Sequence, residues 1–220
     1  MPIPHTAILL FSRTASAEAE RKSFGGGKAD QRITKALISR TEETIARTGL
    51  KLYRSDEASQ RGATFGERLA NAMEEIFALG EERLLVVGND CPQTTASHLR
   101  SAAQKLEAGE NVIGPDQRGG VWLIGLQRTD FDASAFANLA WETSQLYKQL
   151  VGIIPNHAKA SSLSDLNTFD DLSRQWFLLR RQLSELFDLL LLSEAAFGPC
   201  SEQLEPVAIM RGLDRGPPRW

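Results

Sequence analysis

The stretch that decides the fold is Leu84-Leu85-Val86-Val87-Gly88-Asn89-Asp90-Cys91-Pro92. Its four consecutive apolar residues predict a strand covered on both faces, as in a parallel α/β sheet. Pro92 cannot continue a strand, so the strand ends close to Asp90. Ligands of open α/β sheets bind at the carboxyl ends of the strands. We therefore expect Asp90 to bind a metal ion or a substrate, or else to cap the helix that begins near Thr94.

Apolar patterns on both sides of this strand predict alternating strands and helices. The other predicted strands are residues 6–11, 51–55, 111–114 and 119–126, and the predicted helices are residues 32–48, 65–79, 94–108 and one or two within 133–151. The polar stretch 12–28 is predicted to be a flexible loop. Such alternation indicates an α/β fold with a mostly parallel central sheet between two helix layers, a three-layer αβα, Rossmann-like arrangement.

The last quarter of the chain is expected to be helical and then irregular. Residues 169–196 are amphipathic, and Leu189-Leu190-Leu191-Leu192 widen the apolar face. Two explanations stay open: a helix buried against the sheet, or a face that packs against a second subunit in a homodimer. Pro, Gly and Arg accumulate from Gly198 onward. We expect a single domain over residues 1–197 with a long C-terminal helix, followed by an irregular tail over 198–220.

Composition excludes several classes of function. The 220 residues include 25 Lys and Arg against 28 Asp and Glu, a net charge of -3, so no basic excess indicates a nucleic-acid partner. Cys91 and Cys200 form neither a metal-ligand spacing nor a disulfide framework. No segment is long and apolar enough for a membrane span, and residues 6–11 are too short for a secretory signal. We expect a cytoplasmic protein with reduced thiols.

Six stretches share their order and spacing with a known family. They are residues 9–13, Gln60 with 64–69, 87–92, Gly114-Pro115 with 119–126, 141–144 and, more weakly, 165–172. Together they span most of the chain. On these residues the chain resembles the GT-A-like predicted bacterial glycosyltransferases of uncharacterised function, the selenodomain-associated transferase type within the nucleotide-diphospho-sugar transferase superfamily.

The resemblance implies a GT-A fold, a nucleotide-sugar or nucleotide ligand, and Mg²⁺ or Mn²⁺ held by Asp90. The residues it implies for nucleotide or substrate binding are Ser12, Arg13, Lys22, Gln60, Gly66, Arg68, Asn89, Arg118, Gly119 and Gly120. Asp90, Asp116 and Glu142 are the expected catalytic residues. Glu142 would act as a general base toward an acceptor hydroxyl, or it belongs to a capping and packing motif with Trp141 in the core.

Basic residues near the first strand are candidates for phosphate binding. Arg21, Lys22, Lys28 and Arg32 could neutralise a diphosphate, or they could form a solvated loop. The helix that carries Glu67 and Arg68 could point its N-terminus at a phosphate. Alternatively, Arg68 only pairs with a carboxylate at the surface, where it would contribute little.

One departure from the family concerns Arg118. Family members commonly have Asp-Gly-Gly after the Gly-Pro turn, whereas this chain has Arg118-Gly119-Gly120. Asp116, two residues earlier, could partly substitute for the carboxylate. Arg118 could instead bind a phosphate directly, or catalysis could have been lost.

These residues lead to three hypotheses about function. The first is a transferase, a metal-dependent glycosyltransferase with a nucleotide-diphospho-sugar donor. The second is a nucleotidyltransferase of the same fold. That class normally has a Gly-rich loop directly after the first strand, where this chain has Ser12-Arg13-Thr14-Ala15 and its glycines come only at positions 25–27. The third is a catalytically degenerate nucleotide-binding module, which Arg118 motivates.

Overall fold

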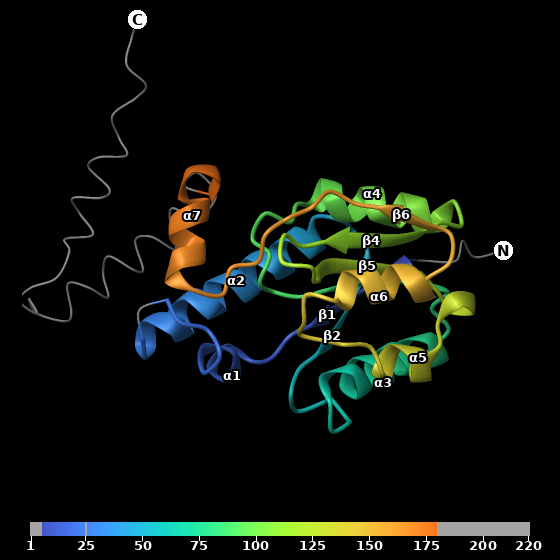
Figure 1. Ribbon diagram of the computed structural model, residues 1–220, viewed down its shortest axis with the longest axis horizontal. Helices are drawn as coiled ribbons and strands as arrows, with labels where there is room; N and C mark the ends of the chain where they lie inside the picture. The colour runs from blue at the N-terminus through green and yellow to red at the C-terminus, as the bar shows by residue number, and fades with distance from the viewer. Residues whose placement is uncertain (1–5, 25, 180–220) are drawn as a thin grey trace, which may run out of the picture.

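A computed structural model of the chain describes residues 6–24 and 26–179. The elements, in chain order, are β1 (Thr6–Phe11), α1 (Ala15–Ala19), α2 (Lys28–Ala46), β2 (Lys51–Ser55), α3 (Phe65–Ala78), β3 (Arg83–Val87), α4 (Ala96–Glu107), β4 (Asn111–Pro115), β5 (Val121–Gln127), a 3-10 turn (Arg128–Asp130), α5 (Ala133–Ala137), α6 (Leu146–Ile153), β6 (His157–Lys159) and α7 (Phe169–Leu179) (Figure 1). The predicted tail over 198–220 and the apolar face near Leu189 lie outside the described residues. The domain boundary at residue 197 therefore stays a prediction.

The strands form one six-stranded sheet in the order β2-β1-β3-β5-β4-β6. β5 is antiparallel to both of its neighbours, and every other pair is parallel. This arrangement confirms the predicted mostly parallel sheet. β5 runs against the others because a short turn joins it to β4, and strands joined by a tight turn must be antiparallel.

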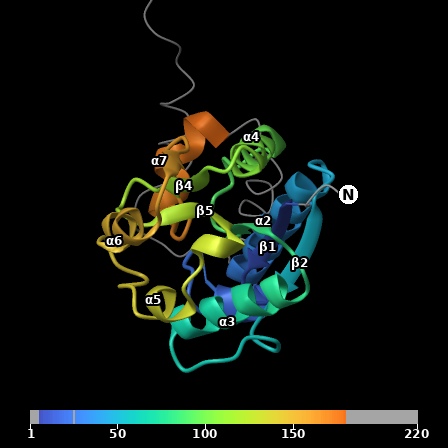
Figure 2. The same cartoon turned by 90° about the vertical axis from the view of Figure 1, so that its right-hand side faces the viewer.

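Helices cover both faces of the sheet, as predicted (Figure 2). Alternate residues of β1 show why: Ala7, Leu9 and Phe11 pack in the core under α3, α5 and α6, whereas Ile8 and Leu10 pack in the core under α2 and α4. All six residues of β1 are buried. A strand buried on both faces has no polar side, which is why β1 and β3 read as continuous apolar runs. Among the described helices, none is long and apolar enough to cross a membrane.

Four elements differ from the sequence-based expectation. The stretch 12–28, predicted to be a loop, contains α1, and α2 begins at Lys28 rather than Arg32. α1 buries none of its residues, so no apolar periodicity could reveal it. β6 was not predicted, because its three residues are not buried. β5 begins at Val121 rather than Gly119, since Gly119 adopts a φ of 89° that ends the strand pattern.

The topology brings the candidate residues to one edge of the sheet. Ser12 follows the end of β1, Gly88 follows β3, and Asp116 follows β4. Because β5 is antiparallel, its first residues lie at this same edge. The segment 160–168, which we call the strap, leaves β6 here and crosses to α7. The connections of the chain run in opposite directions on the two sides of the crevice between the ends of β1 and β3. Ligands of open α/β sheets bind at such a crevice.

Candidate functional site

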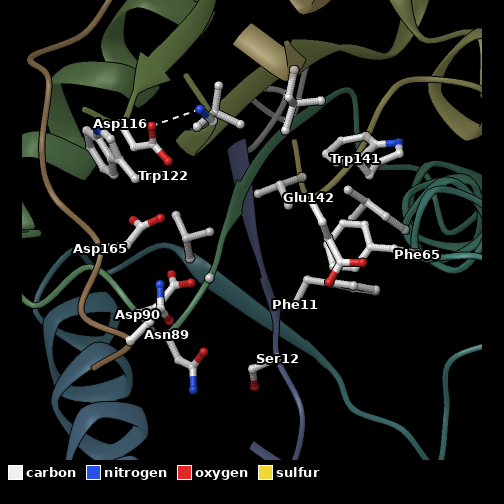
Figure 3. Close-up of a pocket in the computed structure, with 18 of the residues that line it drawn as sticks. Phe11, Ser12, Phe65, Asn89, Asp90, Asp116, Trp122, Trp141, Glu142 and Asp165 are labelled. Atoms are coloured by element: carbon white, nitrogen blue, oxygen red, sulfur yellow. Dashed lines mark hydrogen bonds between the residues drawn. The ribbon is translucent and has the colours of Figure 1, made fainter. Parts of the chain in front are cut away.

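A pocket of about 480 Å³ lies at this edge (Figure 3). This volume is in the range of sites for one small ligand. The predicted residues that line it are Ser12, Arg13, Arg21, Lys22, Gln60, Arg68, Asn89, Asp90, Asp116, Arg118, Gly120 and Glu142. Gly66 and Gly119 are not among the lining residues, and neither are Lys28 and Arg32 of the predicted basic loop.

Three carboxylates, Asp90, Asp116 and Asp165, converge on one side of the pocket (Figure 3). Burial, together with the negative charges of Asp90 and Asp116, raises the pKa of Asp165 to about 8, against the opposing charge of Lys22. Of the two neighbouring negative charges, that of Asp90 raises this pKa more than that of Asp116. Asp165 was not predicted as a site residue, although it begins the weakest of the six matching stretches.

Asp90 is presented to the pocket and does not cap a helix. The N-cap of α4 is Thr95, whose hydroxyl accepts from the backbone N–H of His98 at 3.2 Å. A Cβ on Gly88 would lie 2.9 Å from Asp90 Oδ1, so the glycine leaves room for this carboxylate. The carbonyl of Asp90 accepts from the N–H of Leu166 at 2.7 Å, which ties the strap to the end of β3.

Asp116 organises the turn between β4 and β5. Its Oδ1 accepts from the backbone N–H groups of Arg118, at 2.6 Å, and Gly120, at 2.8 Å. A Cβ on Gly120 would lie 2.5 Å from Asp116 Oδ2, and one on Gly119 would collide with the carbonyl of Ser144. Both glycines are therefore required by the turn and its neighbours. A close approach to ligand, the role expected from the sequence, is not needed to explain them.

Three buried polar atoms around the carboxylates are unsatisfied. Within residues 6–24 and 26–179, Lys22 Nζ and Asn89 Nδ2 have no hydrogen-bond partner, and no donor group reaches Asp165 Oδ1. Lys22 is 6% exposed and Asn89 is 4% exposed. A buried ammonium or amide without a partner is costly, so such groups call for a ligand, an ion or water. All three residues line the pocket.

At the other side of the pocket, Glu142 and Trp141 have different roles. Trp141 packs against Phe65, with ring centroids 5.3 Å apart, and its Nε1–H donates to the carbonyl of Phe136. A Cβ on Gly66 would lie 2.6 Å from the Trp141 ring, so this glycine serves packing. Glu142 has a positive φ of 61°, and its carboxylate accepts from Arg21 at 2.9 Å. Glu142 thus faces the pocket while Trp141 belongs to the packing motif.

The loops after β1 and β2 are joined by Gln60. Its amide donates to the carbonyls of Ser12 and Ser55, each at 3.1 Å. The N-terminus of α3 carries its own capping box between Thr64 and Glu67. The box satisfies the backbone N–H groups of Thr64 and Glu67, and phosphate binding at this helix end stays a prediction. Arg68, rather than forming a surface ion pair, donates to the carbonyl of Ala63 at 3.2 Å.

Arg118 forms an ion pair with Asp171 of α7. The side chain of Asp171 is 4% exposed, whereas that of Arg118 is 56% exposed. Arg118 also lines the pocket, but one of its guanidinium nitrogens donates to the Asp171 carboxylate.

The carboxylates fit a divalent cation that is completed by a ligand. Among the described residues, no group of three or more His, Cys, Asp and Glu forms a metal site by itself. Mg²⁺ in proteins is commonly held by one or two carboxylates, with waters and substrate phosphates supplying the other oxygens. Asp90 and Asp165, with the unsatisfied Oδ1 of Asp165, provide a donor set of this kind.

Known proteins share the fold and part of the sequence. A structure from Desulfovibrio desulfuricans G20, described as a "putative nucleotide-diphospho-sugar transferase", has a TM-score of 0.76 and 20% identity, covering 86% of this chain and 95% of that one. At this identity the likeness shows the fold, and it confirms the expected nucleotide-diphospho-sugar transferase architecture. Rv0371c of Mycobacterium tuberculosis H37Rv, in complex with manganese, has a TM-score of 0.41 and 15% identity, covering 78% of this chain and 97% of that one. That likeness is too weak to support an inference.

Two comparisons rest on sequence. The 2-phospho-L-lactate guanylyltransferase of Methanocaldococcus infernus is 31% identical over 85 residues, which are 39% of this chain and 37% of that protein. The chain thus matches little more than a third of the length of this relative. The model of a family described as "Uncharacterized protein conserved in bacteria (DUF2064)" matches residues 25–143, more than half of the chain. These residues include the end of β3 with Asp90 and the turn with Asp116, and the chain belongs to the DUF2064 family.

Proposed function

We propose that this chain is a divalent-cation-dependent glycosyltransferase that binds a nucleotide-diphospho-sugar at the sheet edge. The observation that carries the proposal is the set of unsatisfied buried atoms: Lys22 Nζ, Asn89 Nδ2 and Asp165 Oδ1. Two are donors and one is an acceptor. A diphosphate with a bound cation would satisfy all three, because its oxygens accept hydrogen bonds and the cation takes the carboxylate.

Asp90 and Asp165 are the residues that would hold Mg²⁺ or Mn²⁺. Such an ion would stabilise the negative charge that develops on the leaving nucleoside diphosphate. Lys22, beside Asp165, would contact a phosphate oxygen from the protein side, and Asn89 would fix its orientation. Nucleoside binding is assigned to the loops after β1 and β2, where Gln60 holds Ser12 in place.

Glu142 is the proposed general base toward the acceptor hydroxyl. Its carboxylate is half-exposed and held by Arg21 at 2.9 Å on the side of the pocket away from Asp90 (Figure 3). A base must come within hydrogen-bond reach of the proton it removes. A carboxylate fixed by an arginine and open to solvent can meet an acceptor that enters from outside.

A nucleotidyltransferase is the second candidate, and the identity to a guanylyltransferase favours it. The loop between β1 and α1 argues for glycosyl transfer. It consists of Ser12, Arg13 and Thr14, without glycine, whereas Gly26 and Gly27 lie at the start of α2 and do not line the pocket. The phosphate-cradling backbone expected of a nucleotidyltransferase is therefore missing from this described loop.

Product analysis separates the two reactions. The protein would be incubated with Mn²⁺ and a panel of nucleotide-diphospho-sugars, and in parallel with nucleoside triphosphates and sugar phosphates. Release of a nucleoside diphosphate from the first panel, lost in Asp90→Asn and retained in Asp170→Asn, whose side chain is exposed and outside the pocket, is the expected result. Pyrophosphate release from the second panel would instead establish nucleotidyl transfer. If neither product is released in the presence of the cation, both enzymatic assignments are contradicted and a nucleotide-binding module is favoured.

A further inference from the structure

The strap, which carries Asp165, is hydrogen-bonded to the sheet edge and to the residue that follows Lys22. From β6 onward, backbone N–H groups donate to the carbonyls of the sheet edge: Ala160 to Ile113, Leu163 to Pro115, and Leu166 to Asp90. The Ser23 N–H donates to the carbonyl of Asn167 at 3.1 Å, next to Lys22 in the chain. The position of Asp165 relative to Asp90 therefore depends on how the strap is held.

The end of the strap is held by one buried carboxylate. Asp171 Oδ2 accepts from the N–H groups of Asn167, at 3.1 Å, and Thr168, at 3.0 Å, and the Asp171 N–H donates to the Thr168 hydroxyl. This is a cap at the start of α7. Gln175, one turn further along, donates to the carbonyl of Asp165 at 2.9 Å. Asp171 thus fixes the two residues that follow Leu166 in the strap.

The remaining oxygen of Asp171 accepts from the Arg118 guanidinium. Although burial disfavours the charged form, the Asn167 amide, the Thr168 hydroxyl and the Arg118 charge together hold the pKa of Asp171 below its usual value. Arg118 belongs to the turn whose amides surround Asp116. The ion pair therefore joins the turn that carries Asp116 to the strap that carries Asp165. These two carboxylates line the same pocket.

We propose that Arg118 is a positioning residue: through Asp171 it locks the strap against the β4–β5 turn and so holds Asp165 in place for a divalent cation. The cation in this statement rests on the proposed function, whereas the locking of the strap does not. A half-exposed ion pair at the surface is worth little, but this pair ends on a side chain that is 4% exposed. Removing Arg118 leaves that buried carboxylate with its charge uncompensated.

The test uses the full chain and two readouts. Hydrogen exchange at the Leu166, Asn167 and Thr168 amides reports the strap without any ligand, and electron paramagnetic resonance of free Mn²⁺ reports cation affinity. In Arg118→Ala we expect faster exchange at these amides and Mn²⁺ affinity weakened by about tenfold or more, the usual effect of losing a residue that orients metal ligands. Arg118→Lys should recover part of both. Arg128→Ala, which removes an exposed pair with Glu82, is the matched control and should change neither.

Arg118→Asp gives the sharpest result, because it replaces the cation that meets Asp171 with a second carboxylate. Facing Asp171, it should loosen the strap further and weaken Mn²⁺ binding below that of Arg118→Ala. Tighter Mn²⁺ binding than in the unaltered chain would overturn the inference and make position 118 a lost ligand. Unchanged exchange in Arg118→Ala would also overturn it.

A second variant covers the case in which Arg118→Ala does not fold. Asp171→Asn keeps a carbonyl acceptor for the strap amides but removes the charge that Arg118 meets, and it should show the same loss of protection. If the unaltered chain binds no Mn²⁺, the proposed function fails, and hydrogen exchange alone still decides whether Arg118 locks the strap.

Discussion

Asp165→Asn is expected to stabilise the protein at alkaline pH while it abolishes cation binding. The pKa of Asp165 is raised from its ordinary 3.8 to about 8 by burial and by Asp90 and Asp116. Between these two values the folded chain holds a proton that the unfolded chain has released. The free energy of unfolding therefore falls as pH rises, by about 1.4 kcal/mol per pH unit from this one group. The contribution is fully present below pH 3.8 and fully lost above about pH 8.

An amide at position 165 does not ionise, so the variant escapes this loss. It is close in size to the protonated acid and, like it, carries no charge beside Asp90 and Asp116. From about pH 5 to about pH 8, the stability of the variant relative to the unaltered chain should increase by about 4 kcal/mol. Urea denaturation at the two pH values measures this difference. Mn²⁺ should stabilise the unaltered chain near the higher pH, because a cation replaces the proton, and should leave the variant unaffected.

Asp170→Asn is the matched control. Its side chain is 79% exposed on the same segment of chain, and the substitution should change stability by less than about 0.5 kcal/mol at either pH. A stability difference for Asp165→Asn that is the same at both pH values would refute the reasoning, since no buried ionisation would then distinguish the two chains.

Three further outcomes are expected. Lys22→Ala should weaken nucleoside diphosphate binding by about tenfold or more, because Lys22 is buried in the pocket without a hydrogen-bond partner. Lys28→Ala, at an exposed position outside the pocket, should leave binding unchanged in the same calorimetric titration. Gly66→Ala should lower the free energy of unfolding by about 1–3 kcal/mol in urea denaturation, because its Cβ would lie 2.6 Å from the Trp141 ring. An unchanged free energy of unfolding would show that the segment with Trp141 moves aside at no cost. Cys91, whose thiol pKa is raised to about 12 by burial, should resist iodoacetamide at neutral pH until denaturant is added, as mass spectrometry would record.

The central fold could be predicted because its signals are local. Four apolar residues before Gly88, followed by Asp90 and Pro92, are enough to indicate a buried strand that ends in a carboxylate. Alternation of such strands with amphipathic segments then predicts the layers. α1 and β6 were missed for the opposite reason: neither has a buried face, so neither leaves a periodic apolar pattern.

The pocket was only partly predictable, because its decisive pairings connect distant residues. Asp165 lies near Asp90 because backbone hydrogen bonds hold the strap that follows β6 against the sheet edge. No periodic pattern around Asp165 indicates this path. The pairing of Arg118 with Asp171 likewise joins residues 53 positions apart. Gly119 could be recognised as special from sequence. That it accommodates Ser144 rather than a ligand required the fold.

Cation-dependent binding of a nucleoside diphosphate is tested most directly by calorimetric titration. Nucleoside diphosphates would be titrated into the unaltered chain and into Asp165→Asn, with and without Mn²⁺. We expect at least one nucleoside diphosphate to bind only when Mn²⁺ is present, and this binding should disappear in the variant. Binding of equal strength without the cation, or binding that Asp165→Asn leaves intact, would contradict the claim that Asp90 and Asp165 hold a cation against the diphosphate.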